Sequence, residues 1–361
     1  MKGHKEVFEA LRREILAGKY DANRRLPSEM ELSRRFGVSR PTISRVTLDL
    51  KREGLIVTRK GAPSVITKYA LNATGALGFV VPGESYAEIF SPLEERLGNL
   101  AERQGWDLIP GEVKSSDPRV RAREVRRLAY KFSKERVAGV FFQPLEFLKD
   151  APRASEEAVR YFDEAGIAVV LLDYDIAPPP ERSRYDVVGI DNMAAGLAVG
   201  RHLVGTGARR ICFLHRPNAA PTVTNRMRGV ASAVIESGGT WTLEGNVLFA
   251  EPENRRAIAK FLKKGFPDAI VAGNDVAAIA LRETLEKIGD GAERIRLAGF
   301  DDVALAGAHN LTTVRQPLDA IAGAALQTLV SRIKAPDLPP RTILLNAELV
   351  VRSALSPAPP R

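Results

Sequence analysis

In its first 70 residues the chain alternates short apolar repeats with turn residues. Phe8, Leu11 and Ile15 recur at helical spacing and predict one face of a first helix. A second helix is expected to begin after Ser28, because a serine caps a helix start, and to end at Gly37, which permits a sharp turn. The pattern therefore predicts two helices around short turns before residue 40.

A third helix is expected to start at Ser39, and Pro41 suits its first turn, where a missing N–H costs nothing. Ile43, Val46 and Leu50 then recur at helical spacing and would pack inward. A capped helix with arginines at its exposed start enters the DNA major groove in helix-turn-helix proteins. The predicted DNA-contacting residues are Ser28, Ser39, Arg40, Thr42, Ser44, Arg45, Lys60 and Gly61.

Two β-rich segments, residues 55–58 and 64–67, flank a basic turn that contains Lys60 and Gly61. Three helices followed by a hairpin with a basic tip predict a winged helix-turn-helix over residues 1–68. The tip of such a wing can reach a neighbouring phosphate or the minor groove.

The charge of the chain is concentrated at this end. Residues 1–75 carry 16 basic and 8 acidic side chains, whereas the other 286 residues carry 37 and 36. A solvated basic surface without a partner is one interpretation. Because the excess coincides with the helix-turn-helix pattern, binding to double-stranded DNA is favoured.

From residue 76 onward, β-rich segments alternate with helical segments. The expected strands cover residues 77–81, 106–109, 138–142, 168–172, 186–190, 210–214, 269–272 and 296–300. The expected helices cover residues 89–104, 119–131, 155–164, 193–205, 226–237, 255–263, 276–288 and 318–333. This alternation predicts an α/β fold with parallel sheets, divided into two lobes over residues 76–355, after a linker at 69–75.

Polar and aromatic residues follow the expected strands, where ligands of parallel sheets bind. Carboxylates, amides and a guanidinium beside aromatic rings suit a polyhydroxylated ligand. The predicted effector-binding residues are Tyr86, Phe90, Gln143, Asp173, Thr222, Arg226, Asn274 and Asp275. Alternatives remain open: Asn274 and Asp275 could cap a helix, Tyr86 and Phe90 could belong to the core, and Asp301 could be structural.

Several classes of protein do not fit the chain. There is no run of 18 apolar residues and no apolar segment of a secretory signal, so we expect no membrane and a cytoplasmic location. The single cysteine, Cys212, allows no internal disulfide. The four histidines lack metal-ligand spacing, and no G-x-S-x-G or P-loop motif occurs. We therefore expect no enzyme, metal or cofactor.

The first 65 residues resemble the GntR family of bacterial transcription regulators. The resemblance rests on ILAGKY from residue 15, LPSE from residue 26, GVSR from residue 37 and EGLI from residue 53. It implies DNA contact through Ser39, Arg40, Thr42 and Arg45, with Gly61 at the wing tip. Ser44 replaces a usual second arginine, and the wing has Gly-Ala-Pro from residue 61 instead of Gly-x-Gly. Both departures predict altered base recognition.

Residues 76–353 resemble the effector domain of the LacI/GalR family, which is related to periplasmic sugar-binding proteins. The motifs are LGFVVP from residue 77, VGIDN from 188, AGND from 272, GFDD from 299 and LTTVRQP from 311. The resemblance implies a ligand between two lobes, faced by Arg226 and Asp275, and a homodimer formed through this domain. The whole layout looks like that of the arabinose-responsive repressors.

Together these patterns predict a ligand-responsive repressor of carbohydrate-utilisation genes that binds operator DNA as a dimer, with affinity set by a sugar-like effector. One alternative keeps the regulator and replaces the sugar by a nucleobase or nucleoside. Another is a sugar-binding protein that does not bind DNA.

Overall fold

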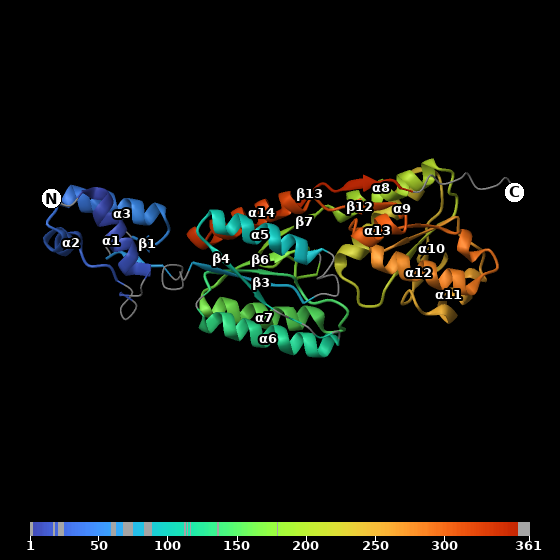
Figure 1. Ribbon diagram of the computed structural model, residues 1–361, viewed down its shortest axis with the longest axis horizontal. Helices are drawn as coiled ribbons and strands as arrows, with labels where there is room; N and C mark the ends of the chain where they lie inside the picture. The colour runs from blue at the N-terminus through green and yellow to red at the C-terminus, as the bar shows by residue number, and fades with distance from the viewer. Residues whose placement is uncertain are drawn as a thin grey trace.

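A computed structural model describes residues 3–16, 19–20, 25–58, 63–67, 75–82, 89–111, 113, 115, 117–135, 137–178 and 180–352. The molecule is elongated, with a small helical unit at one end and two α/β lobes beyond it (Figure 1). We call the described residues between 3 and 67 the head, the lobe beside it the N-lobe and the far lobe the C-lobe.

The head has the predicted order of three helices and a hairpin. Its elements are α1 (His4–Leu16), α2 (Glu29–Phe36), α3 (Arg40–Arg52), β1 (Ile56–Val57) and the antiparallel β2 (Val65–Ile66). At the start of α2, Ser28 Oγ accepts from the N–H of Glu31 at 3.3 Å, and Glu31 Oε2 accepts from the N–H of Ser28 at 2.8 Å. The predicted turn at Gly37 is confirmed, with a φ of 67° that favours glycine.

The predicted apolar faces of the head are confirmed. Leu11 and Ile15 of α1 pack with Ile43, Val46 and Leu50 of α3, and none of these side chains reaches solvent. Because this core uses only one face of α3, the opposite face of the helix stays at the surface.

The N-lobe is built on a six-stranded parallel sheet. Its strands are β3 (Ala76–Val80), β4 (Asp107–Gly111), β5 (Gly139–Phe142), β6 (Ala168–Leu172), β7 (Asp186–Ile190) and β13 (Thr342–Leu345), in the order β13-β7-β6-β5-β3-β4. Helices α5 (Phe90–Arg103) and α14 (Leu318–Lys334) cover one face, and α6 (Pro118–Lys134) and α7 (Ala151–Ala165) cover the other (Figure 1). Neighbouring strand residues such as Phe79 and Val80 pack on opposite faces.

The C-lobe repeats this plan on a smaller parallel sheet. Its strands are β8 (Ile211–His215), β9 (Val247–Phe249), β10 (Ala269–Ala272) and β11 (Arg296–Ala298), in the order β11-β10-β8-β9. Its helices are α8 (Asn192–Gly205), α9 (Pro221–Glu236), α10 (Leu243–Asn246), α11 (Arg255–Leu262), α12 (Asp275–Ile288), η2 (Ala292–Arg294) and α13 (Ala304–Ala308). A small antiparallel pair, β12 (Thr313–Arg315) and β14 (Glu348–Val350), completes the lobe.

Helices α8 and α9 approach each other closely because glycines stand at their contact. A Cβ atom at Gly196 would lie 2.0 Å from the backbone oxygen of Arg226, and one at Gly229 would lie 2.2 Å from that of Met193. No larger residue fits at these positions without separating the helices. The close approach fixes the place of Arg226 beside Asn192, the first residue of α8.

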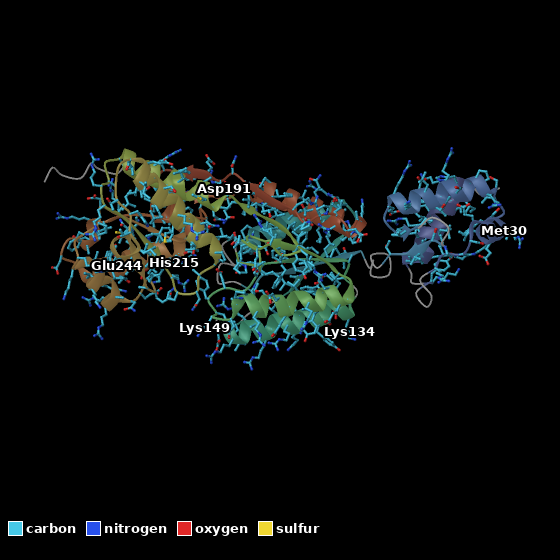
Figure 2. The ribbon with its side chains drawn as sticks, turned by 180° about the vertical axis from the view of Figure 1, so that it is seen from behind. Met30, Lys134, Lys149, Asp191, His215 and Glu244 are labelled. Carbon is cyan, nitrogen blue, oxygen red and sulfur yellow. The ribbon has the colours of Figure 1, made fainter. Side chains whose placement is uncertain are left out.

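The chain passes between the lobes after β7, after β12 and after β13. Asp191, between β7 and α8, marks one of these crossings (Figure 2). After the second crossing, α14 starts beside the C-lobe and runs along the N-lobe to the head (Figure 1). There a Cβ atom at Gly54 would lie 2.8 Å from the backbone oxygen of Lys334, so α14 touches the residue that follows the turn after α3.

The α/β prediction is confirmed, and the eight expected strands of the two lobes appear within about two residues. The short elements β9, β12, β13, β14, α10 and α13 were not predicted. Helix α9 begins at Pro221, five residues before the predicted start, which places Thr222 and Arg226 one turn apart on the same helix. Among the described residues, no helix is long and apolar enough to cross a membrane, and no group of metal-binding side chains occurs.

Candidate functional site

The exposed start of α3 is the first candidate site. Ser39 caps the helix: its Oγ accepts from the N–H of Thr42 at 3.4 Å and lies 2.8 Å from Thr42 Oγ1. Arg40, Ser44 and Arg45 are exposed on the face opposite the head core. Neither arginine forms an ion pair with any residue that the structure describes. Two uncommitted cations therefore accompany the positive end of a helix dipole.

A neighbouring arginine of the head is committed to structure instead. Arg35 bonds to Glu14 and, at 2.8 Å, to the hydroxyl of Tyr20. Burial acts to raise the pKa of Glu14, but hydrogen bonds from Arg35, Lys19 and Tyr20 prevail and lower this pKa to about 2. Glu14 therefore stays ionised and holds α1 against α2. Only some of the head's basic side chains remain for a phosphate partner.

Three more side chains bear on the proposed DNA contact of the head. Lys60 and Gly61, the predicted contacts of the wing, lie outside the described residues. Ser28 is exposed at the start of α2, next to α3. Arg25, which was not predicted, is exposed and forms a β-bridge with Val65. It adds a cation to the base of the hairpin, and its only sequence signal is its place in the basic run before residue 26.

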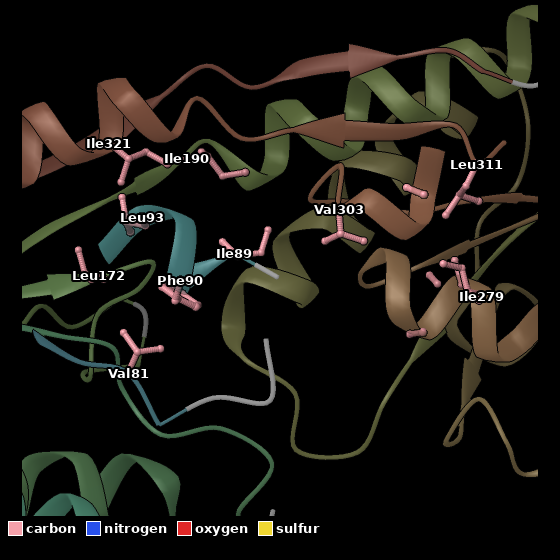
Figure 3. Close-up of a cluster of buried hydrophobic side chains, with 14 of the residues drawn as sticks. Val81, Ile89, Phe90, Leu93, Leu172, Ile190, Ile279, Val303, Leu311 and Ile321 are labelled. Atoms are coloured by element: carbon pink, nitrogen blue, oxygen red, sulfur yellow. The ribbon is translucent and has the colours of Figure 1, made fainter. Parts of the chain in front are cut away.

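The second candidate site is a cleft between the lobes, with a volume of about 60 Å³. The N-lobe contributes the ends of β5 and β6 and the start of α5, and the C-lobe contributes α9 and the residues after β10 and β11. Phe90 and Leu93 of α5 lie beside Leu172 of β6 and form its apolar wall (Figure 3). Strand ends from both sheets thus meet at one place, as expected for ligand sites in parallel sheets.

Arg226 lies in this cleft with a side chain that is almost fully buried. Its Nε donates to Asn192 Oδ1 at 2.7 Å and its Nη1 donates to the backbone oxygen of Gly273 at 2.7 Å. Nη2 lies 3.4 Å from Asp301 Oδ1, and the guanidinium stands 4.8 Å from the ring centroid of Phe300. These partners come from separate elements, so Arg226 is held rigidly and ties α8, β10 and β11 together.

On the opposite wall, Gln143 and Asp173 follow β5 and β6. Gln143 is 3% exposed, and its Oε1 makes no hydrogen bond with any residue that the structure describes. Asp173 has a left-handed φ of 73° and accepts a bond of 3.3 Å from Thr222 Oγ1 of the C-lobe. Burial raises the pKa of Asp173, nearby Arg226 lowers it, and Asp301 raises it further.

The pair Asn274 and Asp275 divides between the cleft and the core. Asn274 lines the cleft and caps α12 by accepting from the N–H of Ala277 at 2.8 Å. Asp275 is fully buried behind it and is not among the lining residues. Its Oδ1 accepts from Thr313 Oγ1 at 2.6 Å and its Oδ2 from the N–H of Val303 at 3.1 Å.

Burial, reinforced by the charge of Asp301, raises the pKa of Asp275 to about 7. The position that the sequence assigned to a ligand contact therefore holds a group that organises the strand ends of the C-lobe. Of the other predicted residues, Phe90, Gln143, Asp173, Thr222 and Arg226 line the cleft with Asn274, and Tyr86 lies outside the described residues.

Sequence reasoning missed Glu146 and Phe147, which also line the cleft, and Asp301, which it treated as structural. Phe147 has a left-handed φ of 58°, and its N–H donates across the cleft to the backbone oxygen of Asn218 at 2.8 Å. Arg216 of the C-lobe stands 4.2 Å from the Phe147 ring centroid and pairs with Glu251 at 2.6 Å. These contacts join the lobes beside the cleft.

Comparison with known proteins supports both resemblances. Residues 4–66 match the family described as bacterial regulatory proteins, gntR family. Residues 201–355 match the periplasmic binding protein-like domain. The head and the C-terminal part of the large domain thus match two separate families, in the predicted order.

Relatives of known function align over nearly the whole chain. The HTH-type transcriptional repressor PurR of Mannheimia succiniciproducens is 25% identical over 346 residues, which cover 90% of this chain and 97% of that protein. A solved complex of the transcriptional regulator CelR with cellobiose is 22% identical, has a TM-score of 0.65 and covers 91% of this chain and 99% of its own. At that identity the likeness shows the shared fold.

A LacI family transcriptional regulator from Enterococcus faecium with bound ribose has the same fold in its large domain. It is 20% identical with a TM-score of 0.62, and the match covers 78% of this chain and 99% of that one.

Proposed function

Because this chain is a transcription regulator, and not an enzyme, with a GntR-type DNA-binding domain joined to a periplasmic-binding-protein-like domain of the LacI type, we propose that it represses carbohydrate-utilisation genes in response to a sugar-like effector. The observation that carries the proposal is the pairing of uncommitted arginines at the start of α3 with a polar cleft between the lobes. The head can bind phosphate, and the cleft between the lobes can bind a small polar ligand.

At the DNA, α3 lies in the major groove with its N-terminal end against the bases. Arg40 and Arg45 reach base edges or phosphates, Ser39, Thr42 and Ser44 contact the backbone and bases, and Ser28 at the start of α2 binds a phosphate. Lys60 and Gly61 complete the contact from the wing. Because Ser44 is short and neutral, the base opposite it is read less strongly than an arginine would read it.

In the cleft, the effector contacts Phe90, Gln143, Asp173, Thr222, Arg226 and Asn274, together with Tyr86. The apolar wall at Phe90 covers a C–H face of the ligand, while the polar groups bind its hydroxyls. Asp275 acts from behind, since its bonds to Thr313 and Val303 hold the strand ends that present Asn274. Ribose and cellobiose in the related structures support this assignment.

Effector binding changes DNA affinity by favouring one arrangement of the lobes. Contacts from Asp173 to Thr222 and from Phe147 to Asn218 cross the cleft, so closure is coupled to the ligand. Helix α14 starts in the cleft at Leu318 and ends beside Gly54 of the head. A shift of this helix displaces the head, and the coupling cannot exceed the effector's differential affinity for the two arrangements.

The regulator acts as a homodimer in the cytoplasm, where two recognition helices reach successive major grooves of a pseudo-palindromic operator. The C-lobe offers a surface for the second copy. Strand β9 is an edge of its sheet, and Phe249 and Leu243, which are 58% and 57% exposed, line a hollow of about 530 Å³ together with Phe261. Apolar groups of this size at a sheet edge favour a protein partner.

A nucleobase effector is the second candidate, and the relationship to PurR favours it. The two candidates differ in what shifts the melting temperature of the protein. A thermal-shift screen of sugars against nucleobases and nucleosides therefore identifies the class, and Gln143→Ala serves as the site control. This variant should lose the ligand-induced shift while keeping nearly the melting temperature of the ligand-free protein.

The DNA part of the proposal is tested by fluorescence anisotropy with the DNA upstream of the protein's own gene. We expect binding that weakens steeply with salt, because released counterions contribute to affinity. Equal affinity for this fragment and for unrelated DNA at every salt concentration would contradict a regulator of that operator. The effector that shifts the melting temperature should then change the affinity for the specific fragment only.

A further inference from the structure

The outer face of helix α6 in the N-lobe concentrates positive charge. Of the 17 residues of the helix, seven are basic and one is acidic, whereas all other residues after position 75 together carry 30 basic and 35 acidic side chains. The inner face packs in the core of the N-lobe through Val125, Ala129 and Phe132. The exposed cations of the outer face are Arg119, Arg123, Arg126, Arg127, Lys131 and Lys134. The basic excess of the large domain therefore lies on a single helix.

Three of these arginines are not neutralised by the protein. Arg119, Arg123 and Arg127 form no ion pair with any residue that the structure describes. Their neighbour Arg126, in contrast, lies 3.4 Å from Glu157 of α7. The three arginines are spaced four residues apart, which places them in one row along the helix. Because like charges at this spacing destabilise a helix, a partner with negative charge would stabilise α6.

A hollow between α6 and α7 lies beside this row of arginines. It has a volume of about 300 Å³ and is lined by Arg123, Arg126, Arg127, Tyr130 and Tyr161. The Tyr130 side chain is 55% exposed, and the ammonium of Lys134 stands 5.3 Å from its ring centroid. Tyrosine and arginine are enriched where proteins bind one another, because each combines a large contact surface with polar groups. The hollow can therefore receive an apolar side chain between cations that bind carboxylates.

The surroundings of α6 favour an acidic protein over DNA as this partner. Helix α7 runs beside α6 and contributes the carboxylates of Glu156, Glu157, Asp163 and Glu164. The major groove of DNA alone is about 12 Å wide, as wide as a whole helix with its side chains, so a duplex on α6 would also approach these carboxylates. Helix α3 lies along the upper edge of the head and α6 along the lower edge of the N-lobe (Figure 1). DNA bound to the exposed face of α3 therefore does not reach α6.

We propose that the outer face of α6 binds an acidic segment of a partner protein. Carboxylates of this segment pair with Arg119, Arg123 and Arg127, and one of its apolar side chains enters the hollow beside Tyr130. The helix from Arg119 to Lys134 is about 22 Å long, which matches an acidic helix of about 15 residues. This contact goes beyond the proposed function, because it lies apart from both the DNA-binding face of the head and the effector cleft.

The test uses a labelled synthetic peptide of about 15 residues, with glutamate at every fourth position and one phenylalanine on the same face. Its fluorescence anisotropy is measured against the full chain at about 0.15 M salt, with enough duplex DNA from upstream of the protein's own gene to occupy the head. The triple variant Arg119→Gln, Arg123→Gln, Arg127→Gln should raise the dissociation constant at least about tenfold, because it removes three ion pairs. The same peptide with lysine in place of glutamate should not bind.

The matched control removes the same charge from another exposed basic segment. Arg255→Gln, Arg256→Gln and Lys263→Gln, in and directly after α11, should together change the dissociation constant less than about twofold. Equal effects of the two triple variants would overturn the inference, because the peptide would then respond only to the net charge of the protein.

A variant without a change of charge tests the hollow. Tyr130→Ala removes the exposed ring and should weaken peptide binding about threefold or more. Its melting temperature should stay close to that of the wild type, because the ring is largely outside the core. If Tyr130→Ala binds the peptide as tightly as the wild type, no side chain of the partner enters the hollow and the inference is overturned.

Two further measurements on the α6 triple variant identify other occupants of this face. Its affinity for the duplex should be that of the wild type, with the same salt dependence, whereas a salt slope smaller by about 0.9 for each lost contact would assign the face to DNA. Sedimentation velocity should give the same oligomeric state for variant and wild type, whereas dissociation of the variant would assign the face to a second copy of the chain. Either of these changes overturns the inference.

Discussion

The head and the cleft use arginine in opposite ways. Arg40 and Arg45 stand exposed at the start of a helix without ion pairs to described residues, whereas Arg226 is 5% exposed and bonds to groups from three elements. An exposed cation costs the free protein little stability, and it contributes to affinity when it contacts a phosphate of DNA. A buried cation is already part of the fold, so it shapes the ligand site instead of supplying free charge.

The largest expected effect comes from removing the buried arginine of the cleft. Arg226→Ala leaves Asp301 without its cation and Asn192 and Gly273 without a donor, so we expect a loss of about 3–5 kcal/mol in unfolding free energy. Urea denaturation measures it. The matched control is Arg228→Ala, an exposed arginine of the same helix that contacts Asn225, which should cost less than about 0.5 kcal/mol. Equal stability of both variants would show that Arg226 is free to serve a ligand.

The same contrast extends to pH, because the carboxylates of the two regions shift in opposite directions. Asp275 has a folded pKa of about 7, above its unfolded value, so stability from this group is lost as pH rises from about 4 to 7. The total is on the order of 4 kcal/mol at most. Glu14 in the head has a folded pKa of about 2, below its unfolded value of about 4.5. Its contribution to the free energy of unfolding is therefore lost as pH falls from about 4.5 to about 2.

Denaturation between pH 4 and pH 8 checks the Asp275 prediction. Asp275→Asn should remove the decline of stability over this window. Because asparagine loses one of the two hydrogen bonds, the variant should be less stable than the wild type at pH 4. Glu14→Gln should leave the decline in place. A wild-type protein whose stability is flat over this window would contradict a raised pKa at Asp275.

How well each region could be predicted depends on how far apart along the chain its interacting residues lie. The head is organised by local signals: the Ser28–Glu31 capping box, the Gly37 turn and the apolar spacing of Ile43, Val46 and Leu50 all lie within about one helix of each other. For that reason its helices and exposed face could be predicted from the sequence.

The cleft is assembled from residues far apart in sequence, and there prediction was less complete. Gln143 and Asp173 follow two predicted strands and both line one cleft in the structure, since parallel strands end at a common edge. The strand ends could not distinguish Asn274, which lines the cleft, from Asp275, whose oxygens turn toward Thr313 and Val303. The hydrogen bond from the N–H of Phe147 to the backbone oxygen of Asn218 crosses between the lobes. It depends on the left-handed backbone of Phe147, which no local sequence pattern predicts.

For the exposed arginines of the head, we expect substitution to weaken DNA binding without lowering the stability of the protein. Arg40→Ala and Arg45→Ala should each weaken operator binding by about 1–3 kcal/mol and leave the melting temperature nearly unchanged. Arg52→Ala, at the far end of the same helix, is the control and should bind DNA almost normally. A variant whose lost arginine contacted a phosphate should also show a salt slope smaller by about 0.9.

The smallest expected effect concerns the contact between Gly54 of the head and Lys334 at the end of α14. It tests whether a shift of α14 at the cleft can affect the head. Gly54→Ala should destabilise the protein by about 1–2 kcal/mol, because φ is 77° and the new Cβ would lie 2.8 Å from the backbone oxygen of Lys334. Gly37→Ala has a similar φ of 67° but open space around it, so it reports the backbone strain alone. The excess cost at Gly54, measured by urea denaturation, is the contribution of the contact with α14. If both substitutions cost the same, the end of α14 does not bear on the head, and the effector must act on the DNA-binding domain by another route.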